Sequence, residues 1–64
     1  MNTVTIYSYV ANTTRAFDFA TQREAINSFI TRCDELGYEY YETSTGMEAG
    51  GIGHDLLITV TFNK

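Results

Sequence analysis

The side chains of this 64-residue chain that could do chemistry are concentrated in its C-terminal half. Between residues 34 and 63 there is no Lys or Arg, and six carboxylates lie there: Asp34, Glu35, Glu39, Glu42, Glu48 and Asp55. Such a set can attract a basic protein, coordinate a metal ion or, as a close pair, act in acid–base catalysis. Glu39 and Glu42 are three positions apart on an expected strand and therefore on opposite faces, so their spacing does not indicate a catalytic pair.

The chain has one histidine and one cysteine. His54 follows Gly53 and is expected to be an exposed loop residue. Cys33 falls on the apolar side of an expected helix, where a free cysteine behaves as a small hydrophobe. A catalytic thiol favours electropositive surroundings, whereas Asp34 and Glu35 follow Cys33 directly. No EF-hand or helical histidine motif is present. We therefore predict a protein that is not an enzyme and that binds no cofactor or metal.

The glycine-rich segment Gly46–His54 invites comparison with a phosphate-binding loop. Such a loop requires a Lys and a following helix N-terminus. Here an expected strand follows, no Lys is present, and Glu48 and Asp55 flank the site. The segment is therefore predicted to be a long flexible hairpin connection with Met47 and Ile52 at its tip. Long loops are often functional, so this tip is a candidate contact for a partner.

A helix is predicted from about Gln22 to Leu36. Thr21 and Glu24 fit a capping box, in which the hydroxyl accepts from one free backbone N–H and the carboxylate reaches back to another. Gly37 stands where a left-handed C-terminal cap is expected. The apolar positions recur every three or four residues, as on one face of a helix: Ala25, Ile26, Phe29, Ile30, Cys33 and Leu36.

Strands are predicted from period-two alternation of β-branched and aromatic residues. In the first, Val4, Ile6 and Val10 are expected to face one way, and a turn follows at residues 11–14. The further predicted strands are Arg15–Phe19, Tyr38–Thr45 and Leu56–Phe62. The order β-β-α-β-β, or β-α-β-β if residues 15–19 are only extended, predicts a single α+β domain over residues 1–64. Its two layers would be one amphipathic helix and a mainly antiparallel sheet of three or four strands.

One face of this sheet has no helix to cover it, and tyrosines are expected there. Tyr7, Tyr9 and Tyr41 give this face a large amphipathic area. Antiparallel sheets commonly show one face to water, so a solvated face is the plain interpretation. A docking surface is the alternative, because tyrosine is enriched at the centres of interfaces. Self-association through this face, or through an edge strand, is equally compatible.

The two halves of the chain differ in net charge, and this difference limits the kinds of partner that the protein can bind. Residues 1–33 sum to +1 and residues 34–64 to −5, which gives the net charge of −4. An acidic half repels phosphate backbones and anionic membranes, and it favours a basic protein surface. A tyrosine platform for nucleic acid would need a positive groove, for which Arg15 and Arg23 are the available cations, so nucleic acid is disfavoured.

The expected compartment is the cytoplasm. A lone cysteine allows no internal disulfide, and the N-terminal residues lack the basic start and apolar run of a secretory signal. No apolar stretch approaches the roughly 20 residues that a membrane span needs, so no membrane association is expected.

The sequence thus predicts a non-catalytic protein-interaction module, a small acidic regulator or inhibitor that docks on a larger basic protein. In size and acidity it is similar to the accessory proteins with which phages occupy host enzymes, a likeness of composition that names no family. The expected contact residues are Tyr7, Tyr9, Glu39, Tyr41, Glu42, Met47, Glu48 and Ile52. The alternatives are a self-assembling, homodimeric structural protein and, less favoured, a nucleic-acid-binding sheet.

Overall fold

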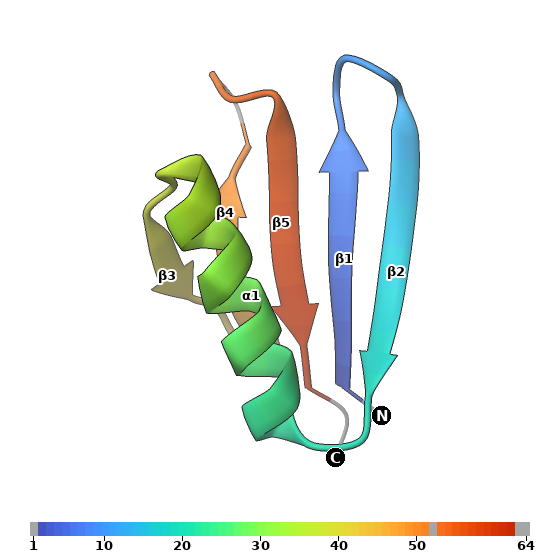
Figure 1. Cartoon of the computed structure of the whole chain (residues 1–64), viewed down its shortest axis with the longest axis vertical. Coiled ribbons are helices and arrows are strands. Elements are labelled where there is room, and N and C mark those ends of the chain that lie inside the picture. The colour runs from blue at the N-terminus through green and yellow to red at the C-terminus, as the bar shows by residue number, and fades with distance from the viewer. Residues whose placement is uncertain (1, 52, 63–64) are drawn as a thin grey trace.

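The chain folds into two layers, with a helix packed on one face of an antiparallel sheet (Figure 1). The computed structural model describes residues 2–51 and 53–62. Within them lie one helix and five strands: β1 (Asn2–Ser8), β2 (Thr13–Phe19), α1 (Gln22–Leu36), β3 (Tyr40–Glu42), β4 (Gly46–Gly50) and β5 (Leu56–Thr61). The predicted α+β class with a helix on an antiparallel sheet is confirmed, and the sheet is one strand wider than the predicted maximum.

The sheet order is β2-β1-β5-β4-β3, so β2 and β3 are the two edge strands. Its registers place a row of residues on the face opposite the helix, which we call the open face. Crossing from β2 to β3, this row is Ala16, Thr5, Thr59, Glu48 and Tyr41. The predicted threonine- and tyrosine-bearing face without a helix is therefore present.

The helix has the predicted bounds and the predicted caps. At its start, the Thr21 hydroxyl accepts a hydrogen bond from the Glu24 backbone N–H at 3.2 Å. The Glu24 carboxylate accepts from the Thr21 hydroxyl instead of reaching a backbone N–H, which differs from the predicted capping box. At its end, Gly37 is left-handed, with φ 72°, and the N–H groups of Gly37 and Tyr38 donate to the carbonyls of Asp34 and Cys33. These two bonds form the Schellman arrangement that turns the chain back toward β3.

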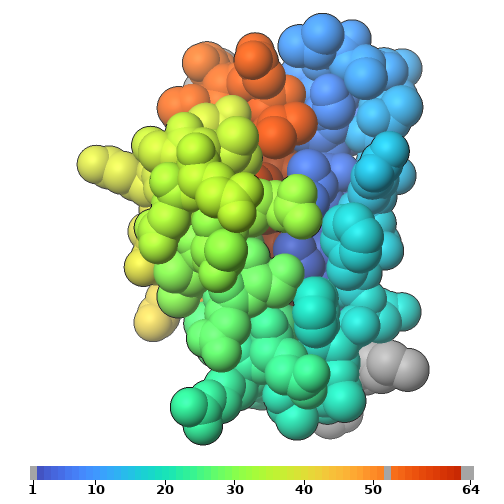
Figure 2. Space-filling view, in the orientation of Figure 1, coloured from blue at the N-terminus to red at the C-terminus, as the bar shows by residue number. Residues whose placement is uncertain are grey.

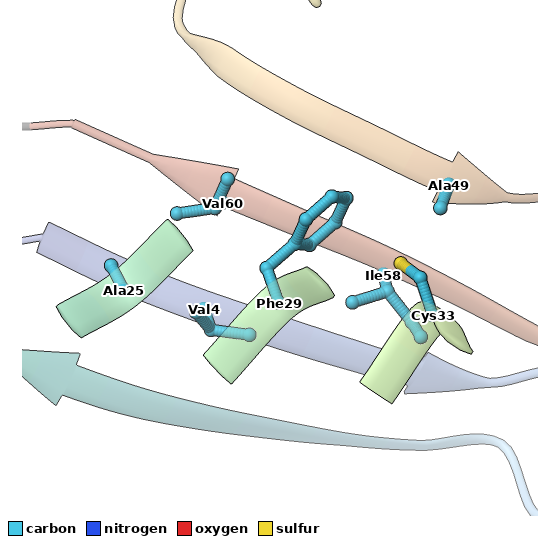
Figure 3. Packing of buried hydrophobic residues seen from close by; sticks show 7 residues of the cluster. All are labelled: Val4, Ala25, Phe29, Cys33, Ala49, Ile58 and Val60. Atoms are coloured by element: carbon cyan, nitrogen blue, oxygen red, sulfur yellow. The ribbon is translucent and has the colours of Figure 1, made fainter. Parts of the chain in front are cut away.

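Seven buried side chains make the core between the two layers (Figure 3): Val4, Ala25, Phe29, Cys33, Ala49, Ile58 and Val60. The helix contributes Ala25, Phe29 and Cys33, which are spaced four apart and form one row facing the sheet. Leu36, predicted in the same row, is 41% exposed because it lies outside that spacing of four.

The largest difference from the predicted fold is strand β4. Gly46–Gly50 was expected to be part of a loop, and it is a strand that pairs with both β3 and β5. A side chain at Gly46 would place its Cβ 1.8 Å from the Val60 carbonyl oxygen, so the close approach of the backbones requires glycine there. The predicted strand Tyr38–Thr45 is shorter, because β3 ends at Glu42 and residues 43–45 turn into β4.

The first hairpin also differs from its prediction. Strand β1 ends at Ser8, and Val10, expected to face inward, is 79% exposed in the turn. Strand β2 begins at Thr13 rather than Arg15, and it pairs with β1 over its whole length. The turn therefore spans residues 9–12, two positions earlier than predicted.

The helix covers only part of the sheet face on which it packs, and it leaves β2 largely uncovered (Figure 1). All of β2 except Phe19 is exposed. Figure 2 shows a shallow groove between the helix and β2, with β1 visible at its floor. The Arg32 guanidinium lies 5.9 Å from the centre of the Phe17 ring and is a contact between α1 and this edge.

Candidate functional site

The edge of the sheet at β3 carries four of the predicted contact residues. Glu39 lies in the segment between α1 and β3, Tyr41 and Glu42 are on β3, and Glu48 is on β4. We call Glu39, Tyr41, Glu42 and Glu48 the acidic edge. The register places Tyr41 opposite Glu48 on the open face, whereas Glu42 lies opposite Met47 on the helix side. Carboxylates therefore lie on both faces of this edge.

Tyr41 and Glu48 are tied together across the two strands. The Tyr41 hydroxyl donates a hydrogen bond to a carboxylate oxygen of Glu48. This bond raises the pKa of Tyr41, with smaller contributions from desolvation of the phenol and from the negative charge of Glu48. Tyr41 is 54% exposed, so the hydrogen bond fixes the orientation of a large amphipathic side chain that water and partners can reach.

A shallow hollow lies beside Tyr41 and is lined by Gly37, Glu39, Tyr41, Gly50 and His54. The His54 ring stacks at a tilt on the Tyr38 ring, with the ring centres 4.5 Å apart. The turn that carries His54 is closed by a backbone hydrogen bond from the His54 N–H to the Gly51 carbonyl at 3.0 Å. His54 is exposed, as predicted, and it forms one wall of this hollow.

The other three carboxylates of the C-terminal half lie outside the acidic edge. Asp34 and Glu35 are exposed in the last turn of α1, and Asp55 is exposed in the turn before β5. No three His, Cys, Asp or Glu residues come together as metal ligands in the part of the chain that the structure describes. What these residues share is exposure and a negative charge near one end of the sheet.

The other two predicted tyrosines belong to a different part of the sheet. Tyr7 is on β1 and on the open face, but three strand spacings, about 14 Å, separate its strand from that of Tyr41. The Tyr7 hydroxyl donates to the Asn12 side-chain oxygen at 2.8 Å, and its ring packs edge-on against Tyr9, with centres 4.9 Å apart. Tyr7 and Tyr9 thus form a separate pair beside the first turn. Arg15 lies opposite Ile6 on the helix side, so it does not supply the open face with a positive groove.

The predicted apolar tip of the glycine-rich segment is wrong for Met47. Met47 is in strand β4 and packs partly buried against the core. It faces the helix because it lies opposite Val60, whose side chain is buried. Ile52, the other predicted tip residue, lies outside the described residues. Met47 therefore lies on the helix side of the acidic edge, in a strand and not at the tip of a loop.

Cys33 is fully buried in the helix row of the core, as expected from its position. Burial raises the pKa of its thiol, and the neighbouring Asp34 carboxylate raises the pKa further. Both effects keep the sulfur protonated, which is the less reactive form.

Two side-chain pairings of the site have no signal in the sequence. Tyr41 and Glu48 are seven residues apart, and they meet only because β4 turns back beside β3. Tyr38 precedes β3 and His54 follows β4, so their rings also meet only because β4 pairs with β3. Strand β4 was not predicted because it contains two glycines, and glycine is depleted in strands on average.

Comparison with known proteins gives no relative: no family model, curated protein or solved structure matches this chain. In the described residues, the helix is too short and too polar to cross a membrane.

Proposed function

We propose that this protein is a non-catalytic interaction module of the cytoplasm, a small acidic regulator or inhibitor that docks through the acidic edge on a larger protein with a basic surface. The observation that supports this proposal is the exposed Tyr41 side chain, held by Glu48 and beside Glu39 in one hollow, with Glu42 on the other face of the same edge. Aromatic side chains supply contact area at interface centres, and charges around them steer association and fix register.

The electrostatics of this region point to a basic protein. The described chain from Asp34 to Phe62 carries six carboxylates and no Lys or Arg. A patch of one sign speeds encounter with a surface of the opposite sign. Nucleic acid and anionic lipid carry the same sign as this edge, so they are repelled by it.

The short edge strand supports a side-chain interface rather than strand addition. β3 has three residues, which offer few backbone groups to an added strand. Recognition would therefore depend on the Tyr41 ring and on the carboxylates, with the hollow beside His54 available to a basic side chain.

Affinity capture with two charge-matched variants tests this proposal. The acidic-edge variant (Glu39→Lys, Glu42→Lys) and the helix-end variant (Asp34→Lys, Glu35→Lys) each bring the net charge from −4 to zero. Capture from cell lysate at low salt, followed by mass spectrometry, should give a basic protein that binds the natural chain and the helix-end variant, and that the acidic-edge variant loses. High salt should release it, because exposed charges are screened. Capture of no protein at low salt, or equal loss by both variants, would contradict the proposal.

A further inference from the structure

The opposite edge of the sheet has the features of an interface of a different kind. β2 has seven residues, and all of them pair in continuous register with β1, so its outer side presents a straight row of backbone N–H and C=O groups. Natural edge strands are commonly protected by shortness, proline, bulges or charges. The chain contains no proline, and the unbroken register of β2 leaves no bulge. Its two charges, Arg15 and Asp18, cancel.

We infer that β2 pairs with β2 of a second copy of this chain, in an antiparallel two-fold dimer centred on Ala16. An edge strand can pair with a strand of a different protein or with the same strand of a second copy. The residues of β2 are complementary to those of a second β2. A two-fold axis through Ala16 overlaps all seven residues of both strands. Thr14 then lies opposite Asp18 of the second copy on the open face, and Arg15 lies opposite Phe17 on the helix side.

Each of these pairs has a counterpart within the monomer. Thr3 donates a hydrogen bond from its hydroxyl to Asp18 at 2.7 Å across β1 and β2, so a threonine opposite Asp18 has suitable geometry. The Arg32 guanidinium already lies 5.9 Å from the centre of the Phe17 ring, which is 40% exposed. An arginine from the second copy would meet the same ring, and cross-strand pairs of this kind stabilise sheets.

The same symmetry would place the exposed helix-side residues of the two β2 strands next to one another. A two-fold axis perpendicular to the sheet keeps both helices on one side, with the two β2 strands between them. The Phe17 rings of the two copies become diagonal neighbours, within reach of aromatic side chains. The exposed helix-side surface of β2 would then lie beside the same surface of the second copy.

The other edge does not fit this role. β3 has three residues, and a second copy there would bring Glu42 and its neighbouring carboxylates close to their own images. Pairing β2 with β3 of another copy would not close and would produce filaments. The β2 dimer closes on itself and places the two acidic edges at the far ends of a continuous sheet, where both remain accessible.

Disulfide cross-linking of single-cysteine substitutions tests the register. Ala16→Cys places the two new sulfurs across the axis, with Cβ atoms about 4.5–5.5 Å apart, so oxidation should yield a covalent dimer. Thr14→Cys and Asp18→Cys should not cross-link alone, because four residues along the strands separate each from its own image by about 13 Å. An equimolar mixture of these two should cross-link. The natural chain serves as control, since its Cys33 is buried. Failure of Ala16→Cys to cross-link would overturn the proposal.

A second measurement avoids any covalent bond. Sedimentation of the natural chain up to millimolar concentration should show a species of twice the monomer's 7.2 kDa. The two-fold axis places residue 17 of each copy opposite Arg15 of the other, so every substitution at position 17 acts in two pairs. Phe17→Lys would therefore create two repulsive pairs of positive charges, and Phe17→Glu would create two attractive pairs of opposite charge. The dissociation constant of Phe17→Lys should exceed that of Phe17→Glu by about tenfold or more, with both variants folded by circular dichroism. A monomer at every concentration, or no difference between the two variants, would overturn the proposal.

Discussion

The two edges of this sheet differ in length, in charge and in what supports them. β2 is seven residues long, is nearly neutral and is largely uncovered by the helix, whereas β3 is three residues long and belongs to the acidic edge, which has carboxylates on both faces. β3 also has support from the core, because Tyr40 packs edge-on against the buried Phe29 ring at 5.8 Å. A long neutral edge favours backbone pairing, and a short charged edge prevents it and leaves side chains to make the contacts. We therefore propose that one edge binds a second copy and that the other binds a basic protein.

Removal of the Phe29 ring should have the largest effect on the stability of the fold, and hence on both edges, because the ring lies at the centre of the core. Phe29→Ala should destabilise the fold by about 3–5 kcal/mol, which is comparable to the whole stability of so small a domain. Thermal unfolding followed by circular dichroism would measure this loss. Leu36→Ala on the same helix should cost less than about 1 kcal/mol because that side chain is partly exposed. Similar losses in the two variants would mean that Phe29 is not the centre of the core.

Gly46→Ala should act on the acidic edge selectively. The added Cβ would meet the Val60 carbonyl at 1.8 Å, so β4 must shift and carry β3 with it, at a cost of about 1–3 kcal/mol. Ser44→Ala, in the exposed turn between the same two strands, should be nearly neutral. Amide hydrogen exchange should show faster exchange in β3 and β4 of Gly46→Ala, with β1 and β2 little changed. If amide exchange became faster by the same factor in all strands, the two edges would not be stabilised independently.

Arg32→Ala should have a smaller effect, on the β2 side. Loss of the cation above the Phe17 ring should cost about 0.5–1 kcal/mol, since the pair is exposed. A double-mutant cycle with Phe17→Leu isolates this contact, provided that it is measured below the concentration at which dimers form. A coupling energy of zero would remove Arg32 as a support of this edge.

The smallest effect concerns the Tyr41–Glu48 hydrogen bond. Because the pKa of Tyr41 is raised in the fold, the stabilisation from this bond is present below the ordinary tyrosine pKa of about 10 and is lost as the pH rises through the raised value. Ultraviolet titration should detect a tyrosine that ionises above the ordinary range. Glu48→Gln should move this ionisation back toward the ordinary range, since it removes the charged acceptor. An unchanged titration in this variant would show that Glu48 does not hold Tyr41 in solution.

Local patterns in the sequence were sufficient to predict the helix and its caps, because Thr21 and Gly37 act through neighbours within a few residues. Alternation was sufficient to predict β5 and most of β2. Strand β4 could not be predicted in this way, because the reason for Gly46 is the approach of Val60, fourteen positions later in the chain. The acidic edge could be predicted only as a set of charges. Its geometry, with Tyr41 held by Glu48, depends on the pairing of β3 with β4.

The central claim is that the two edges bind different partners independently, and one paired measurement tests it most directly. The oligomeric state and the capture of a basic protein would both be determined for Phe17→Lys and for the acidic-edge variant. We predict that Phe17→Lys becomes monomeric and retains a basic protein, with weaker apparent affinity where the dimer had bound through two edges. The acidic-edge variant should remain dimeric and lose that protein. If both variants lose the same property, or if the acidic-edge variant becomes monomeric, the two edges are not independent and the account is wrong.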